Sequence, residues 1–157
     1  MQKDFTKNFI KGKIGEIIFD QMFKEKGKFI VIPFGYEKMI PEFAQYAFKA
    51  EHQEVIDNIR GAPDFALVSQ DRKEVFLIEV KYRSTINMEE LKKTSDKIQK
   101  RWKLVWMFIC TPNGFYFDKT TDIIKNGKLT PLRQNWICQE KQEKYLKVLN
   151  NFIKKGC

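Results

Sequence analysis

The sequence has few of the residues that build zinc sites, disulfide frameworks and two-histidine catalytic centres. Its three cysteines, Cys110, Cys138 and Cys157, are widely spaced and form no Cys-x-x-Cys pair. An odd, scattered set of this kind excludes a disulfide scaffold and a cysteine zinc site. His52 is the only histidine, so chemistry that needs two histidines is excluded. Its acidic neighbours favour the interpretation of His52 as a surface residue.

Long apolar runs are also absent. Residues 1–13 lack the apolar core of a signal peptide, and no run approaches the length that spans a membrane. We therefore expect a cytoplasmic protein with no membrane partner. The sequence shows no internal repeat, linker or low-complexity segment, so residues 1–157 are expected to form a single domain.

Aromatic and positively charged side chains, by contrast, are abundant. Hydrophobic residues make up 43% and aromatic residues 14% of the chain, with 14 phenylalanines, which favours a packed globular core. Lysine and arginine number 29 against 20 aspartates and glutamates, giving a formal net charge of +9. A balance this basic suggests a polyanionic partner such as a nucleic acid.

The most informative stretch lies between residues 61 and 84, where two predicted strands flank a polar turn. The first strand is expected over Asp64–Ser69 and the second over Glu74–Tyr82. Because side chains alternate along a strand, Glu79 and Lys81 continue a face that begins with apolar residues. Charges in such positions need partners or a metal ion. The hairpin can place Asp64 beside Glu79.

Two carboxylates and an ammonium on adjacent strands make a site of hard oxygen ligands, which suits Mg²⁺. Pro63-Asp64, followed by Glu79-Val80-Lys81, resembles the PD-(D/E)XK motif of the restriction-endonuclease-like nuclease superfamily. The resemblance implies a Mg²⁺-dependent endonuclease, with Mn²⁺ as a substitute ion, that hydrolyses phosphodiester bonds in DNA, with RNA as the alternative substrate. The alternative interpretation is an ion pair of Lys81 with Asp64 or Glu79 that caps the edge of a sheet.

The resemblance also implies a role for each residue of the motif. Asp64 and Glu79 would hold the ion, with the Val80 carbonyl and Glu16 completing the site. Lys81 would orient the attacking water or stabilise the developing negative charge. Glu16 enters because it follows a glycine on a predicted helix before the sheet, where superfamily members often carry a glutamate.

That first helix is predicted over Phe5–Lys26 by the periodicity of its apolar residues. The predicted apolar stripe consists of Phe9, Ile10, Ile14, Ile17, Ile18, Met22 and Phe23. Gly12 and Gly15 lower helix propensity, and their presence indicates the close approach of another backbone or of a ligand.

A second helix is predicted after Asn87, an N-cap residue with Glu90 three positions later. Its inner face is predicted to carry Met88, Leu91, Ser95, Ile98 and Trp102. Gln99 lies beside this face, where some superfamily members place a glutamine near the metal, and is a candidate catalytic residue. Predicted contacts to nucleic-acid phosphates are Arg83, Lys92, Lys93, Lys97, Lys100, Arg101 and Lys103.

The remaining segments complete an α/β fold. Buried strands are expected over Lys28–Pro33 and Leu104–Thr111, a helical insertion between the first strand and Gly61, and an edge strand over Phe115–Phe117. A turn is expected at Asn126-Gly127, and the inner residues of a last helix over 139–155 are predicted to be Leu146, Leu149, Phe152 and Ile153. The order resembles the restriction-endonuclease-like core, a mixed αβββαβ sheet flanked by helices, with a helical insertion after the first strand and a C-terminal hairpin plus helix.

Two other hypotheses remain open at this stage. The chain can be a non-catalytic nucleic-acid-binding protein that retains the nuclease fold, or a protein interaction module. Binding of nucleic acid should weaken steeply as salt rises, whereas the interaction module predicts affinity insensitive to salt. One nuclease site cuts one strand, so double-strand cleavage would need a homodimer or sequential nicks.

Overall fold

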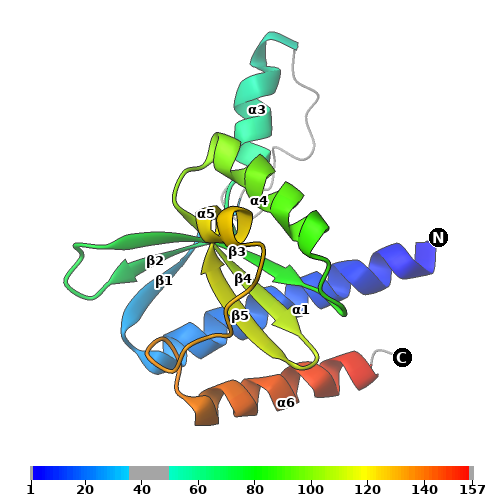
Figure 1. The fold of residues 1–157 in the computed structure, drawn as a ribbon, viewed down its shortest axis with the longest axis vertical. Helices are drawn as coiled ribbons and strands as arrows, with labels where there is room; N and C mark the ends of the chain where they lie inside the picture. Colours follow the sequence, from blue (N-terminus) through cyan, green and yellow to red (C-terminus); the bar gives the residue numbers. More distant parts are fainter. Residues whose placement is uncertain (1, 36–49, 156–157) are drawn as a thin grey trace.

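A computed structural model of the chain describes residues 2–35 and 50–155, which form an α/β fold (Figure 1). Within these residues, five α-helices and a short 3-10 helix surround a five-stranded mixed sheet, so the predicted α/β class is confirmed. In chain order the elements are α1 (Gln2–Lys26), β1 (Phe29–Pro33), η2 (Ala50–His52), α3 (Gln53–Arg60), β2 (Phe65–Ser69), β3 (Val75–Tyr82), α4 (Met88–Arg101), β4 (Val105–Thr111), β5 (Gly114–Lys119), α5 (Thr120–Asn126) and α6 (Gln139–Lys155).

The strands follow one another across the sheet in chain order. β1, β2 and β3 form an antiparallel meander, β4 runs parallel to β3, and β5 turns back antiparallel to β4. A parallel pair needs a crossover connection, which α4 supplies between β3 and β4. From α1 to β4 the elements therefore keep the predicted order of helix, three strands, helix and strand.

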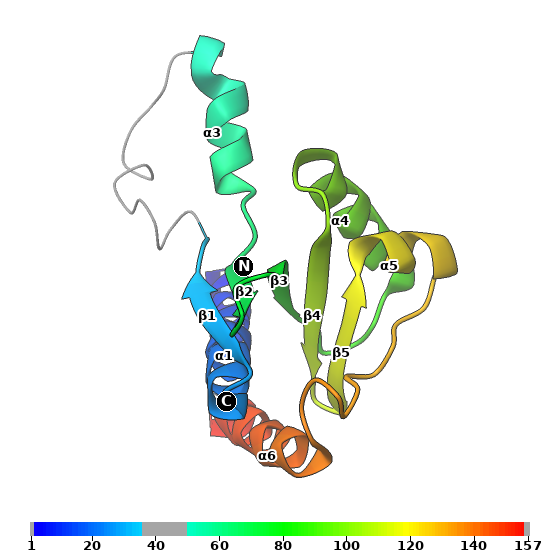
Figure 2. The ribbon, with the colours of Figure 1, turned by 90° about the vertical axis from the view of Figure 1, so that its left-hand side faces the viewer.

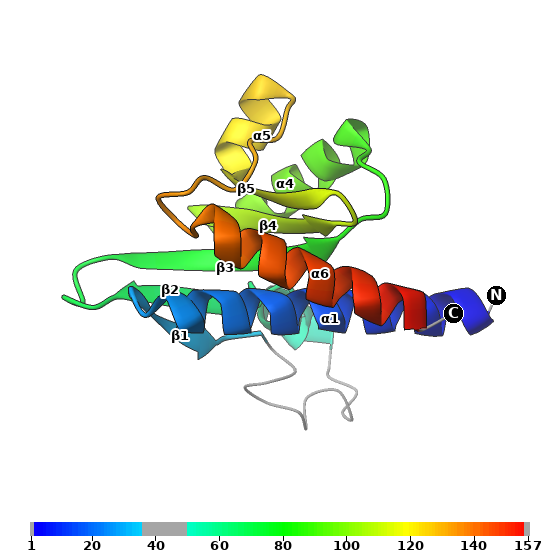
Figure 3. The same cartoon turned by 90° about the horizontal axis from the view of Figure 1, so that it is seen from below.

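Helices cover both faces of the sheet (Figure 3). α1 and α6 lie on one face, where Phe19, Phe23, Phe65 and Phe108 are fully or almost fully buried in the larger core. α4 and α5 lie on the other face over a smaller core of Leu91, Met107, Ile109 and Ile123. β3 is the middle strand, and α1 packs on the face of β3 that carries Ile78 and Val80.

α1 buries a narrower face than predicted. Ile18, Phe19, Met22 and Phe23 are at most 3% exposed, but Phe9, Ile10 and Ile17 are 53%, 52% and 60% exposed. The prediction of an inward position for these last three residues is wrong for two physical reasons. The first turns of the helix extend past the edge of the sheet (Figures 1 and 3), and Ile17 points away from the core.

α1 and α6 run side by side in opposite directions (Figure 3). The last turn of α1 is clamped to the first turns of α6 through Glu25. The Lys144 ammonium donates to the Glu25 carboxylate at 3.1 Å, the Tyr145 hydroxyl donates to the same carboxylate, and Lys141 donates to the Glu25 carbonyl at 3.0 Å. Residues about 120 positions apart in the chain are thus joined.

The hairpin and the insertion match the sequence in part. β2 and β3 each begin one residue later than predicted, which leaves Asp64 just outside β2. The insertion contains η2 and α3, and α3 projects away from the sheet (Figures 1 and 2). On α3, Ile56 is buried and Val55 is 57% exposed. The predicted helical residues Phe43, Ala44, Ala47 and Phe48 lie outside the described residues.

The C-terminal third contains the predicted hairpin and last helix, together with an unpredicted helix, α5. Thr120 begins α5 with its hydroxyl donating to the Val105 carbonyl at 3.0 Å, and Ile123 is fully buried. Gly127, predicted as a turn, ends this helix with φ of 64°. On α6 Leu149 is buried as predicted, but Phe152 is 57% exposed because it lies near the free end of the helix.

Among the helices of residues 2–35 and 50–155, none is both long and apolar enough to cross a membrane.

Candidate active site

Asp64 lies at the point where the ladder between β2 and β3 ends. The last backbone pair is Phe65 with Ile78, so the next position along the register sets Asp64 opposite Glu79. In place of a further backbone hydrogen bond, the Val80 N–H donates to Asp64 Oδ2 at 2.8 Å. The carboxylate of Asp64 is therefore fixed against β3 at the end of the hairpin, as the sequence predicts.

The backbone of Asp64 is held as firmly as its side chain. Its carbonyl accepts hydrogen bonds from the N–H groups of Phe34 and Gly35 at 2.9 and 3.1 Å. A Cβ at Gly35 would lie 3.6 Å from the Asp64 Cα and 3.7 Å from Oδ1, so the two segments are in close contact. Trp102, at the end of α4, packs edge to face on Phe34 with ring centroids 5.5 Å apart. The segment that presents Asp64 is thus braced from two sides.

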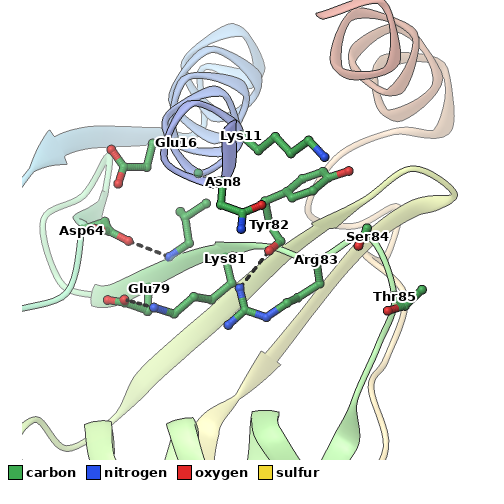
Figure 4. A pocket seen from close by; sticks show the side chains of 12 residues that line it. Asn8, Lys11, Glu16, Asp64, Glu79, Lys81, Tyr82, Arg83, Ser84 and Thr85 are labelled. Atoms are coloured by element: carbon green, nitrogen blue, oxygen red, sulfur yellow. Dashed lines mark hydrogen bonds and ion pairs between the residues drawn. The ribbon is translucent and has the colours of Figure 1, made fainter. Parts of the chain in front are cut away.

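Glu79 and Lys81 project from the same side of β3 (Figure 4). Lys81 Nζ lies 3.0 Å from Glu79 Oε1, and the side chains are 28% and 15% exposed, respectively. The intervening residue, Val80, is buried in the core on the α1 side. The alternation predicted for this strand is confirmed, and so is an ion pair between Lys81 and Glu79.

Glu16 reaches the same region from α1 (Figure 4). Its side chain is 17% exposed and its Oε2 lies 3.6 Å from Lys13 Nζ. The preceding residue, Gly15, is buried, and a Cβ there would lie 3.6 Å from both the Val80 side chain and the Cys110 sulfur. α1 therefore lies close to the sheet at this glycine, and this contact brings Glu16 to the end of the hairpin. The neighbours of Gly15 are side chains, not the predicted backbone or ligand, and a Cβ at Gly12 would meet nothing within 4 Å.

One open cavity of about 520 Å³ joins these side chains. It lies between the middle of α1 and the last residues of β3 (Figure 4). Its lining consists of Asn8, Lys11, Gly12, Glu16, Asp64, Glu79, Val80, Lys81, Tyr82, Arg83, Ser84 and Thr85. Four of the five predicted catalytic residues are therefore brought together from three segments that are distant in the sequence.

The ionised forms of Asp64 and Glu79 are destabilised in this cavity. Burial raises the pKa of Asp64 to about 7, and the negative charges of Glu79 and Glu16 add to the rise against the opposing Val80 N–H and Lys81. Burial likewise raises the pKa of Glu79, and Glu16 adds to it, although the Lys81 ammonium pulls the other way. The pKa values of Asp64 and Glu79 are raised despite Lys81, so an additional positive charge beside these two carboxylates would be favourable.

The donor chemistry fits a magnesium ion. Within residues 2–35 and 50–155, no three His, Cys, Asp or Glu side chains stand in an arrangement that would hold a metal by themselves. Mg²⁺ does not need three such side chains, because it binds through one or two carboxylates and keeps several waters. Asp64 and Glu79 supply two such carboxylates, and Glu79 would share its charge between the ion and Lys81.

Two residues predicted to take part in the site, Gln99 and Arg83, make other contacts in the structure. Gln99 does not line this cavity; it lines a separate one between α4 and α5, with Thr121 and Ile124. Its Oε1 is buried and finds no hydrogen-bond partner among residues 2–35 and 50–155. Arg83 lines the main cavity, but its guanidinium donates to both carboxylate oxygens of Glu90 at 2.6 and 3.1 Å. Arg83 is therefore engaged within the protein.

The other predicted phosphate contacts form an exposed basic surface. Lys92, Lys93, Lys97, Lys100 and Arg101 are exposed on α4, and Lys103 is exposed just after it. Only Lys100 among them has a recorded acidic partner in the described part of the chain, Asp96 at 3.2 Å. His52 is exposed beside Glu51, which confirms its interpretation as a surface residue.

Five residues that line the cavity were not predicted to have a functional role. These are Asn8, Lys11, Tyr82, Ser84 and Thr85. Lys11 Nζ lies 5.6 Å from the centre of the Tyr82 ring, and the two side chains extend side by side, directed away from Asp64 and Glu79 (Figure 4). A usable signal existed, because Asn8, Gly12 and Glu16 recur every four residues and so share one face of the helix.

The chain matches no protein-family model, and a search of curated proteins finds no similar sequence. The geometry and charge of the cavity are thus the basis for assigning a function.

Proposed function

We propose that this protein is a metal-dependent nuclease that hydrolyses phosphodiester bonds in DNA, with RNA as the alternative substrate. The observation that carries the proposal is the convergence of Glu16, Asp64, Glu79 and Lys81 on one cavity. A bound Mg²⁺, or Mn²⁺ in its place, would lower the pKa of a coordinated water and offset charge on the phosphate.

The chain itself contributes preorganised charge at this cavity. Asp64 cannot swing away, since Val80 N–H holds its carboxylate and two further N–H groups hold its carbonyl. Glu79 is the second carboxylate for the ion, and Glu16 adds negative charge from the α1 side. Lys81 has three N–H donors, one of which is directed at Glu79. The others can orient a water or a phosphate oxygen as negative charge develops.

The fold and the motif support the same assignment. The order of elements from α1 to β4 is compatible with a restriction-endonuclease-like core. The Pro63-Asp64 and Glu79-Val80-Lys81 segments lie side by side at the end of the β2–β3 ladder. The exposed lysines of α4 provide a basic surface suited to a polyanion.

The proposal is tested by incubating the pure protein with supercoiled plasmid and with circular single-stranded DNA, in Mg²⁺, in Mn²⁺ and in chelator. The Lys81→Ala and Asp64→Asn variants are compared with Lys73→Ala, which changes an exposed lysine in the turn at the far end of the hairpin. We expect metal-dependent cutting that falls by about a hundredfold or more in the two cavity variants, since each removes a preorganised charge. Lys73→Ala should cut normally.

Full activity of Lys81→Ala would rule out this centre. If the native protein cuts none of the substrates but binds DNA in a salt-sensitive manner, the non-catalytic nucleic-acid-binding hypothesis replaces the nuclease.

A further inference from the structure

The first turns of α1 carry two exposed phenylalanines on the face that leads to the cavity. Phe5 is 75% exposed and Phe9 is 53% exposed. Side chains three, four and seven positions apart share a helix face, so Phe9 lies in line with Gly12 and Glu16, both of which line the cavity. Phe5 is aligned in the same way with the cavity residue Asn8. The two rings therefore extend the lining of the cavity beyond the edge of the sheet.

The spacing of Phe5, Phe9 and Glu16 along α1 suits a chain of nucleotides. The helix rises 1.5 Å per residue, which sets Phe5 and Phe9 about 6 Å apart along the axis and Phe9 about 10 Å from Glu16. Successive bases of a single strand can stack on aromatic rings at such intervals. Between the rings and Glu16 lies Gly12, where an added Cβ would meet nothing within 4 Å. The helix surface is therefore open along this path.

The charge around the rings favours a polyanion over a second copy of this protein. Residues 2–15 contain four lysines and one acidic residue, Asp4. Lys13 Nζ lies 5.5 Å from the centre of the Phe9 ring, and Lys11 extends over Tyr82 at the mouth of the cavity. Two such segments brought together in a dimer would repel each other, whereas a phosphate backbone would be attracted.

We propose that Phe5 and Phe9 stack on unpaired bases next to the phosphate held in the cavity, so that the substrate is single-stranded nucleic acid or the single-stranded part of a duplex. The inference rests on the proposed nuclease function, because it takes the cavity as the place of the phosphate. Ring stacking requires exposed base faces, which a continuous duplex does not offer.

The test measures binding of a fluorescent oligothymidine and of a duplex of equal length by anisotropy, in chelator so that no cutting occurs. Phe9 is changed to Ala, Leu and Tyr. Ile10→Ala and Ile17→Ala serve as controls, because both isoleucines are similarly exposed on other faces of the same helix. We expect Phe9→Ala and Phe9→Leu to raise the single-strand Kd about tenfold or more, and Phe9→Tyr and the controls to change it by less than about twofold. Duplex binding should stay unchanged.

Normal single-strand binding by Phe9→Leu, or an equal loss of duplex binding, would overturn the inference. A Phe9-dependent dimer would also overturn it. If sedimentation shows a dimer that Phe9→Ala converts to a monomer without a change in oligonucleotide affinity, Phe5 and Phe9 form a contact with a second copy of the protein. The binding readout is independent of cleavage. If the protein cuts DNA but binding does not depend on Phe9, the nuclease proposal holds and the stacking proposal fails. If binding depends on Phe9 but no cutting occurs, the stacking proposal holds and the nuclease proposal fails.

Discussion

At the scale of single residues, Asp64 is both the best anchored and the most strained side chain of the cavity. It accepts hydrogen bonds through its carboxylate and its carbonyl, yet it is buried close to Glu79 and Glu16. Burial and the negative charges of Glu79 and Glu16 raise the pKa of Asp64, whereas the Val80 N–H that fixes its carboxylate opposes the rise.

The raised pKa of Asp64 predicts that the stability of the metal-free protein depends on pH. The usual Asp pKa of 3.8 applies to the unfolded chain and a pKa of about 7 to the folded one. The folded state thus binds the proton more tightly, and the free energy of unfolding should fall as pH rises from about 4 to about 7. Asp64→Asn keeps an acceptor for Val80 N–H and cannot ionise. Urea unfolding in chelator should find this variant more stable than the native protein at pH 8, by on the order of 2 kcal/mol, and similar at pH 4.

The matched control is Asp71→Asn, which changes an exposed aspartate in the hairpin turn whose pKa is lowered by the Ser69 hydroxyl. This control should retain the loss of stability between pH 4 and pH 7. A native protein whose unfolding free energy is flat over that range would contradict the electrostatic description of the cavity.

Gly15 gives a second prediction at this scale. An added Cβ would lie at ordinary van der Waals distance, 3.6 Å, from Val80 and Cys110, so a methyl group fits. Since alanine favours a helix over glycine by up to about 1 kcal/mol, Gly15→Ala should raise the melting temperature slightly. Gly15→Leu should lower it by pushing α1 off the sheet. Thermal unfolding of the two variants checks the prediction, and a destabilised alanine variant would contradict it.

The central site residues were predictable because their positions follow from local rules. Strand alternation placed Glu79 and Lys81 together, and the hairpin register placed Asp64 beside them. The pairing of Arg83 with Glu90 and the location of Gln99 in another cavity depend on where α4 crosses the sheet. Helical periodicity identifies the buried face of α4, but does not fix that crossing.

At the scale of elements, α4 connects the basic surface to the candidate active site. Its outer side carries exposed lysines, and Trp102 at its end packs on Phe34 and donates to the Asn58 carbonyl at 3.2 Å. The helix was predictable from its N-cap and periodicity. α5 was missed because seven residues carry too short a pattern, and its helical state depends on Ile123 packing against α4 and β4.

The N-cap of α4 can be tested directly. Asn87 Oδ1 accepts a hydrogen bond from the Glu90 N–H at 3.2 Å. Asn87→Ala removes this acceptor and should lower the free energy of unfolding by about 1 kcal/mol, whereas Asn87→Asp should retain most of it. Equal stability of both variants and the native protein in urea would show that the cap contributes nothing.

At the scale of the whole molecule, the net charge is +9, and exposed lysines lie on both α4 and α6, which cover opposite faces of the sheet. Val80 faces α1, so the neighbouring Glu79 and Lys81 project from the other face of β3, the face of the sheet that carries α4. Lys93, Lys97 and Lys100 share one exposed side of α4, since they are four and three positions apart. Changing all three to Gln should reduce the slope of log Kd against log salt for oligonucleotide binding by about 2 to 3, because each lost phosphate contact contributes roughly 0.7 to 0.9.

The control for this triple variant replaces Lys147, Lys154 and Lys155, which are exposed on α6 on the opposite face of the sheet (Figure 3). An equal reduction of slope in both triple variants would mean that charge acts without regard to position and that α4 is no specific contact surface. The basic composition alone predicts a polyanionic partner. Which face of the molecule contacts that partner follows only from the packing of α4 over the sheet.

The clamp between Glu25 and α6 bears on the order in which the chain can fold. Joining Asp64 to β3 closes a loop of 16 residues, whereas joining Glu25 to Lys144 and Tyr145 closes one of about 120. The longer closure costs about 2 kcal/mol more in chain entropy. The acidic pair on the hairpin can therefore assemble early, but α1, which carries Glu16, gains its second packing partner only once residues 139–155 have been synthesised. In a chain still emerging from the ribosome, α1 would lack the support of α6, so the proposed nuclease centre would reach its final rigidity late in synthesis.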